Sequence, residues 1–188
     1  LGYLEEIADA IYHDNTLQED ARTLRTQIEE GIRNYGIVET SDYGKIYAYE
    51  TDGFGQYNLM DDANIPSLLS IPYLGYQGDD TILQNTRRFI LSDANPCYYQ
   101  GIFARGIGSP HTPVNHVWHL SLIMQGLTAV DEQEQRDILQ MLLKTDAGTN
   151  LMHESFHVDN PNQYTRKWFS WANALFCELI LKICGYRI

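Results

Sequence analysis

The chain has 188 residues, of which 44% are hydrophobic and 20% charged, and its formal net charge is −12 at pH 7. These values are typical of a globular protein, and the length suits one domain with a sizeable core over residues 1–188. No apolar run approaches the ~20 residues that span a bilayer, and so acidic a surface repels the phosphates of nucleic acids and anionic membranes. We therefore expect neither nucleic acid nor a membrane as a partner.

The first forty residues predict two helices. Residues 3–13 place Leu4, Ile7 and Ile11 on one face, and residues 15–36 continue with apolar side chains at the same helical period. The short polar break between the two segments predicts an antiparallel pair.

The next segment is irregular. Lys45–Glu50 has the composition of a strand, but Gly53 and Gly55 interrupt it. A short apolar helix is expected at residues 67–70, between two prolines, and a longer helix at residues 79–92.

Residues 93–113 form a long loop rich in glycine and proline, and long ordered loops in compact domains are usually functional. Helices are predicted over residues 115–129, 131–146 and 167–185. Because helical periodicity dominates and strand alternation is weak, the prediction is an all-α fold of helical hairpins with functional residues on the loops.

Cysteine usage bears on the compartment. The three cysteines, Cys97, Cys177 and Cys184, form neither a disulfide framework nor a Cys-x-x-Cys metal motif. This pattern fits a reducing compartment, and a cytoplasmic location is the expectation. Since the sequence starts at Leu1 and not at a methionine, we expect it to be part of a longer protein.

The sequence contains a His-Glu-x-x-His motif, formed by His153, Glu154 and His157. In zinc peptidases with this motif, two imidazoles one helical turn apart hold a catalytic zinc ion and the glutamate activates water. Glu178 would be a third ligand. Against this interpretation, the Asn160-Pro161 pair leaves little more than two turns for the helix that the motif requires. A zinc peptidase is therefore the weaker alternative, and neither a metal nor a cofactor is expected.

Several longer stretches together resemble one family, glycoside hydrolase family 125, the exo-acting α-1,6-mannosidases. They occur in the order of the family and cover roughly Tyr47 to Ile180. One departure is His119, where the family commonly has proline after the tryptophan. The stretches are "YETDGFGQYNLMDDANIPSLLSIPYLGY", "GIGSPHTP", "HVWHLSLIMQGLT", "AGTNLMHESFH" and "RKWFSWANALFCELI".

The resemblance implies an (α/α)6 toroid, of which this chain would form the C-terminal half. It also implies a metal-independent, inverting hydrolysis of α-mannoside glycans, with Glu154 of "MHESF" as the general base and an aspartate upstream of residue 1 as the general acid. An inverting glycosidase needs two carboxyl groups ~6.5–9.5 Å apart, so that a water fits beside the base. The missing half of the toroid, or self-association, would have to cover the face that it leaves open.

Asp61 and Asp62 could hydrogen-bond sugar hydroxyls or support the base, and Asp61 is a fallback general acid. The alternative is helix capping, because Asp62 comes shortly before the expected helix that begins near Pro66.

Further substrate-binding candidates are Arg105, His111, Trp118, His153 and Trp171. Loop glycines would bring Arg105 and His111 close to a ligand, although the arginine could instead anchor a carboxylate. The tryptophans could stack on the C–H faces of a sugar or pack in the core. His153 would position its neighbour Glu154 or hydrogen-bond the substrate.

The sequence thus supports an exo-acting α-1,6-mannosidase first. A non-catalytic helical module, either glycan-binding or a subunit fragment, is the second hypothesis, and a zinc peptidase the third.

Overall fold

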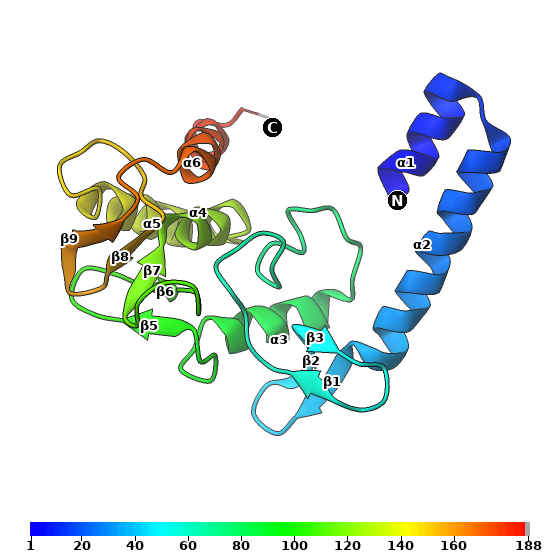
Figure 1. The fold of residues 1–188 in the computed structure, drawn as a ribbon, viewed down its shortest axis with the longest axis horizontal. Helices are drawn as coiled ribbons and strands as arrows, with labels where there is room; N and C mark the ends of the chain where they lie inside the picture. The colour runs from blue at the N-terminus through cyan, green and yellow to red at the C-terminus, as the bar shows by residue number, and fades with distance from the viewer. Residues whose placement is uncertain (187–188) are drawn as a thin grey trace.

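Two helices at the start of the chain stand apart from the other elements (Figure 1). The structure, a computed structural model, describes residues 1–186. Helix α1 (Gly2–Ile7) continues into a short π-helix, η1 (Ala8–Tyr12), and after a left-handed turn at His13 the chain returns as α2 (Asn15–Tyr35). Asp14 caps α2 by accepting hydrogen bonds from two free backbone N–H groups. The predicted helical pair is confirmed, and we call residues 2–35 the arm.

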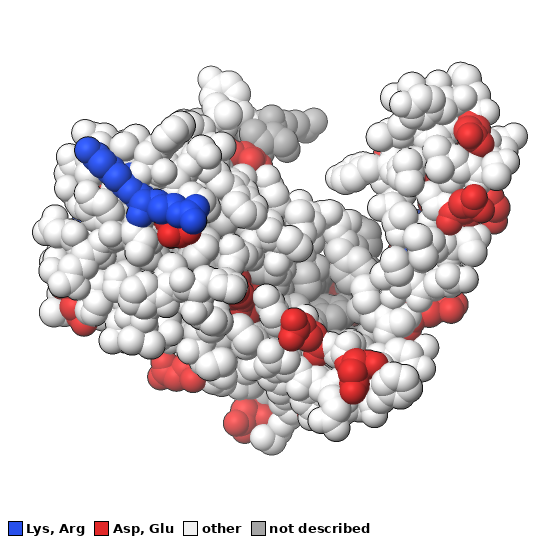
Figure 2. Space-filling model, viewed as in Figure 1, with Lys and Arg blue, Asp and Glu red and all other residues white. Residues whose placement is uncertain are grey.

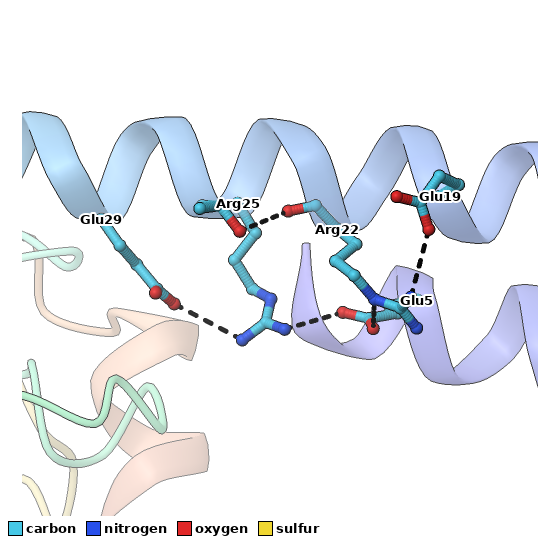
Figure 3. A network of polar contacts seen from close by, with 6 residues as sticks. Glu5, Glu19, Arg22, Arg25 and Glu29 are labelled. Carbon is cyan, nitrogen blue, oxygen red and sulfur yellow. Dashed lines mark hydrogen bonds and ion pairs between the residues drawn. The ribbon is translucent and has the colours of Figure 1, made fainter.

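Ion pairs hold the arm together (Figure 3). The two carboxylate oxygens of Glu5 lie 2.8 Å from Arg22 Nε and 2.9 Å from an Arg25 terminal nitrogen. Arg22 also pairs with Glu19 at 3.1 Å, and Arg25 with Glu29 at 3.4 Å. The hydrogen bond from Arg22 lowers the pKa of Glu5, which therefore stays ionised.

The arm buries little apolar surface. Ala8 and Ala21 are its only buried residues within the described chain. Between α1 and the rest of the molecule is a hollow of ≈860 Å³, visible in Figure 2, which Tyr3 lines from the arm and Glu178 and Lys182 from the opposite side. No helix within residues 1–186 is long and apolar enough to cross a membrane.

Short hairpins follow the arm. Strand β1 (Ile37–Thr40) pairs antiparallel with β2 (Gly44–Tyr47), and β3 (Glu50–Thr51) pairs with β4 (Tyr57–Asn58). Helix α3 (Asp80–Ile90) packs on β2. The short helix that we expected between the prolines is instead a series of turns.

Two further sheets lie in the second half of the chain. One is the hairpin of β5 (Tyr98–Gln100) and β6 (Arg105–Ile107). The other has three antiparallel strands in the order β7 (His116–Trp118), β8 (Ser155–His157) and β9 (Asn160–Thr165), with an irregularity in the pairing at Phe156/His157.

The core surrounds helix α4 (His119–Leu127), which packs against α5 (Glu132–Lys144) and α6 (Ser170–Ile183). Every residue of α4 except Gln125 is buried. Gly126 allows α6 to approach closely, because a Cβ atom there would lie 3.0 Å from a methyl carbon of Leu179.

The prediction of an all-α fold, the C-terminal half of an (α/α)6 toroid, is wrong. Residues 1–186 contain nine strands in four antiparallel sheets beside the helices, so the fold is mixed α and β. The strands are 2 to 6 residues long. Alternation of polar and apolar side chains needs a longer window to be recognised, and two of the hairpins, β3–β4 and β5–β6, have glycine-containing turns that resemble loops in sequence.

Candidate active site

Glu154 lies where the chain enters β8, in a bend that belongs to no regular element. Its side chain is 13% exposed, and its Oε1 atom lies 3.2 Å from Arg166 Nε. Arg166 directly follows β9, and its guanidinium carbon is 5.9 Å from the centroid of the Phe169 ring. The three side chains therefore form a partly covered carboxylate site at the end of the three-stranded sheet.

Figure 2 shows acidic groups scattered over one face of the molecule. A single basic patch stands out on this face, above the region of β8 and β9 in Figure 1. A neutral ligand would meet no overall charge barrier on such a surface.

The segment Asp146–Glu154, which we call the Glu154 loop, has an unusual backbone. Ala147, Gly148 and Asn150 all have positive φ angles, of 53°, 69° and 58°. The Asp146 carboxylate stabilises the turn by accepting hydrogen bonds of 3.0 Å from two backbone N–H groups within the loop. Non-glycine residues rarely adopt left-handed conformations, and such residues concentrate at functional sites.

Two buried histidines hold the end of this loop. The His153 backbone N–H donates a 2.8 Å hydrogen bond to His119 Nδ1. Burial lowers the pKa of His119 to about 3, so that its ring stays neutral and can accept this bond. The His153 ring stacks on Tyr164 with centroids 3.9 Å apart, and its two nitrogens lie 2.7 Å from the Lys167 carbonyl oxygen and 3.1 Å from that of Asp146.

This geometry removes the basis of the zinc hypothesis. The stretch around His153 and His157 is a bend followed by a strand, so the helix that would align the two imidazoles is missing. Both nitrogens of the His153 ring face carbonyl oxygens, and Glu178 accepts a hydrogen bond of 3.0 Å from Tyr73 beside the hollow. Among residues 1–186, no group of three or more His, Cys, Asp or Glu side chains is arranged to hold a metal ion.

His153 was also a substrate-binding candidate. Since its ring is fully buried and both nitrogens face the backbone, it offers no atom to a sugar hydroxyl in this conformation.

Asp61 and Asp62 have separate environments. Asp61 is fully buried, and its two oxygens accept hydrogen bonds from the N–H groups of Leu68 at 2.8 Å and Leu69 at 3.0 Å. Burial raises its pKa to about 7. Asp62 binds the backbone and side-chain amides of Asn64, each at 3.1 Å. Asp61 therefore caps the turn at Leu68 and has no surface for a ligand, whereas Asp62 caps no helix, because none forms here, and bonds only Asn64.

A close backbone contact brings the Asp62 segment to the glycine-rich loop. The Ala63 N–H donates a 3.0 Å hydrogen bond to the Gly108 carbonyl oxygen. A Cβ atom on Gly108 would lie 2.1 Å from the His116 carbonyl oxygen, so only glycine fits beside β7. His111, three residues further on, is exposed. The loop therefore presents His111 to solvent while its start is packed against the sheet.

The candidate tryptophans differ in exposure. Trp118 is 4% exposed, donates a 2.9 Å hydrogen bond to Thr112 Oγ1 and packs edge-on against Phe169 at 5.9 Å. Trp171 is 40% exposed and lies 6.3 Å from the same phenylalanine ring. Trp118 is thus a core residue below the site, whereas Trp171 can offer a face to a ligand.

Arg105 is exposed at the start of β6 and lines a cavity of ≈270 Å³. Its companions there include Gln125, Asp131 and Glu134, and they do not include Glu154. The structure therefore gives no support for one ligand that contacts both Arg105 and Glu154.

Arg166 and Phe169 were not singled out from the sequence. Both fall within "RKWFSWANALFCELI", one of the stretches that carry the family resemblance. An arginine next to a sheet-end carboxylate could have been found only by knowing that β8 and β9 pair.

The comparisons with known proteins agree with this resemblance. Residues 1–181 match a family described as metal-independent alpha-mannosidase (GH125). The "Meiotically up-regulated gene 157 protein" of Schizosaccharomyces pombe is 46% identical over 185 residues, which are 97% of this chain and 36% of that protein.

A solved structure from Streptococcus pneumoniae is 49% identical, with a TM-score of 0.95 over 99% of this chain and 44% of the other. It is described as a non-productive substrate complex with α-1,6-mannobiose, within work on metal-independent alpha mannosidases. The chain spans less than half the length of these two relatives. With a family match over nearly its whole length, the chain belongs to glycoside hydrolase family 125.

Proposed function

We propose that this chain supplies the general base of an inverting glycosidase that removes terminal α-1,6-linked mannose from glycans. The observation that carries the proposal is Glu154, a mostly covered carboxylate held by Arg166 at the end of the sheet. Substrate specificity is suggested by the streptococcal relative, which was solved with α-1,6-mannobiose.

In such a reaction the base takes a proton from the water that attacks the anomeric carbon. Arg166 pairs with Oε1 of Glu154, which leaves Oε2 to accept the proton. A second carboxyl group must protonate the leaving oxygen. Asp61 caps a turn with both of its oxygens, so we assign this general acid to a part of the protein outside residues 1–188.

Two exposed side chains of the set predicted from the sequence are further candidates for substrate contact. Trp171 offers an aromatic face to the C–H groups of a sugar ring, and His111 offers ring nitrogens to hydroxyl groups. Asp62 remains a candidate through Oδ2, because both of its hydrogen bonds to Asn64 use Oδ1.

We further propose that residues 1–188 belong to a single domain whose remaining part packs against the arm and the hollow. The arm leaves Ile7, Ile11, Leu24 and Ile28 exposed, and contiguous apolar surfaces of this kind mark contacts with other protein. Alternatively, a second copy of the chain covers the same surface.

The test uses the full-length protein with α-1,6-mannobiose. Glu154→Gln keeps the shape of the side chain but removes the proton acceptor, so kcat should fall ~10²–10⁴-fold while KM changes little. Glu134→Gln is the matched control, because Glu134 is also a carboxylate paired with an arginine, Arg87, at 2.8 Å. We expect its kcat to be unchanged at a temperature well below unfolding.

Three further measurements sharpen this test. Proton NMR of the first-formed product should show β-mannose, as inversion of an α-linkage requires. A chelator should not lower activity, and His157→Ala should cost far less than Glu154→Gln. Full activity of Glu154→Gln, together with strong loss in His157→Ala, would contradict the proposal.

A further inference from the structure

Two loops that form the carboxylate site are joined by one side chain of α6. We propose that Asn173 is a positioning residue for Glu154: its amide binds the backbone of the Glu154 loop and of the segment that carries Arg166. This inference rests on the proposed function, because it gives Asn173 a role only through the base.

The geometry is a pair of hydrogen bonds between an amide and a single peptide residue. Asn173 Oδ1 accepts from the Met152 N–H at 3.0 Å, and Asn173 Nδ2 donates to the Met152 carbonyl oxygen at 2.8 Å. Met152 is thereby held as if it faced a neighbouring strand, although Asn173 lies on a helix. Only His153 separates it from Glu154 in sequence.

The second N–H of the same amide points to the other loop. Nδ2 donates to the Phe169 carbonyl oxygen at 2.8 Å, and the Phe169 N–H donates to the Met152 carbonyl oxygen at 3.1 Å. Asn173 thus uses both donors and its acceptor in this one junction. Phe169 is the residue whose ring lies under the Arg166 guanidinium, so the junction fixes both partners of the Glu154–Arg166 pair.

Such a junction matters because the Glu154 loop has no ladder of strand hydrogen bonds to hold it until β8 begins. Its backbone includes left-handed residues, which persist only when surrounding contacts enforce them. A misplacement of a catalytic group by about 1 Å can cost ~10²-fold in rate.

A purely structural role is the competing explanation. The bond from Nδ2 to the Phe169 carbonyl oxygen spans the first turn of α6 and would stabilise the start of that helix without reference to Glu154. Loss of stability alone therefore supports neither explanation, and the experiment must measure catalysis.

The experiment uses the full-length protein and two variants. Asn173→Asp keeps an acceptor for the Met152 N–H but replaces both donors with an oxygen that repels two carbonyl groups. Asn173→Ala removes the amide without this repulsion, in case the aspartate variant fails to fold. We expect kcat to fall about 10- to 100-fold in each variant that folds, with KM changed by no more than about threefold.

Thr86→Val is the matched control. Thr86 is a buried side chain that also bonds the backbone of a distant segment, since its Oγ1 accepts from the Tyr47 N–H at 2.9 Å and donates to Ile82 O. It lies on α3, outside the residues of the carboxylate site. This variant should lower the unfolding temperature and leave kcat unchanged.

A double-mutant cycle decides whether Asn173 acts through the base. An activated aryl α-mannoside keeps the residual rate of Glu154→Gln measurable. We expect Asn173→Asp or Asn173→Ala to add little further loss in the Glu154→Gln background, because the base is already absent. Unchanged kcat in both single variants, or the same loss with and without Glu154, would overturn the positioning role. Full activity of Glu154→Gln itself would instead refute the proposed function.

Discussion

The arm and the remainder of the molecule are built on different principles. In residues 2–35 the buried side chains are two alanines, and salt bridges hold α1 to α2. In the remainder, helix α4 alone buries eight of its residues and lies between α5 and α6. Hydrophobic burial is the main source of stability in a fold, whereas exposed ion pairs contribute little. The remainder therefore carries its own core, and the arm depends on what covers it.

The largest expected effect is on the core. Phe156 is fully buried and stacks on His119 at 4.6 Å, so Phe156→Ala should lower the free energy of unfolding by ~3–5 kcal/mol. In the arm, Ile11 is 67% exposed, and Ile11→Ala should change the free energy of unfolding by less than ~0.5 kcal/mol. Urea denaturation of both variants measures the difference. Similar losses would mean that the arm has a core after all.

The second effect is a loss of stability in acid. The folded-state pKa of His119 is about 3 because burial disfavours its charged form, whereas the ordinary value is 6.5. The unfolded chain thus binds the proton more readily, so stability should fall as the pH drops from about 6.5 towards 3. His119→Asn retains an acceptor for the His153 N–H and should flatten this fall. Unfolding free energies at several pH values give the slope of stability against pH. Identical slopes for the unsubstituted protein and His119→Asn would show that His119 does not cause the loss.

Asp61 should act in the opposite direction. Burial raises its pKa from 3.8 to about 7, so the folded state holds the proton more tightly than the unfolded one. This carboxyl should therefore reduce stability as the pH rises from about 4 to 7. Asp61→Asn should remove that contribution, at the cost of one acceptor for the turn at Leu68. Unfolding free energies over the same pH series measure this contribution. If stability declined more steeply with rising pH in Asp61→Asn than in the unsubstituted protein, the predicted sign would be wrong.

The smallest effect concerns the arm. Glu5→Gln removes the carboxylate that binds Arg22 and Arg25, so amide hydrogen exchange in α1 should become faster while that in α4 stays unchanged. Since the pKa of Glu5 is lowered by Arg22, its contribution is present above the ordinary value of 4.5 and is lost as the pH falls through the folded-state value. High salt should mimic the substitution. Equal acceleration in α4 would show that the arm and the core open together.

The helices were predictable because their signal is local. The 3.6-residue period of apolar side chains identified α2, α3, α5 and α6 approximately, whatever the rest of the chain does. The strands were missed for the opposite reason. Strand β7, for instance, has only three residues and exists because it pairs with β8, almost forty residues later.

The candidate site, too, was predictable only in part from the sequence. The stretch that contains Glu154 could be found from its residues and from the family resemblance, and the sequence also supplied His111 and Trp171, which are exposed. It could not tell that the His153 ring is buried, or that Asp61 uses both oxygens on backbone N–H groups. These facts depend on which backbone groups lie opposite each side chain.

The sequence by itself determined the family and most of the helical segments, and it pointed to the carboxylate that we propose as the general base, because these depend on residue identity and short-range spacing. Only the tertiary structure decided which residues surround that carboxylate. Arg166 reaches Glu154 because β8 and β9 pair, and Asn173 reaches Met152 because α6 packs beside the Glu154 loop. Polar contacts of this kind require atoms within about 3 Å of each other. No pattern along the chain encodes that proximity, which arises only when the core around α4 closes.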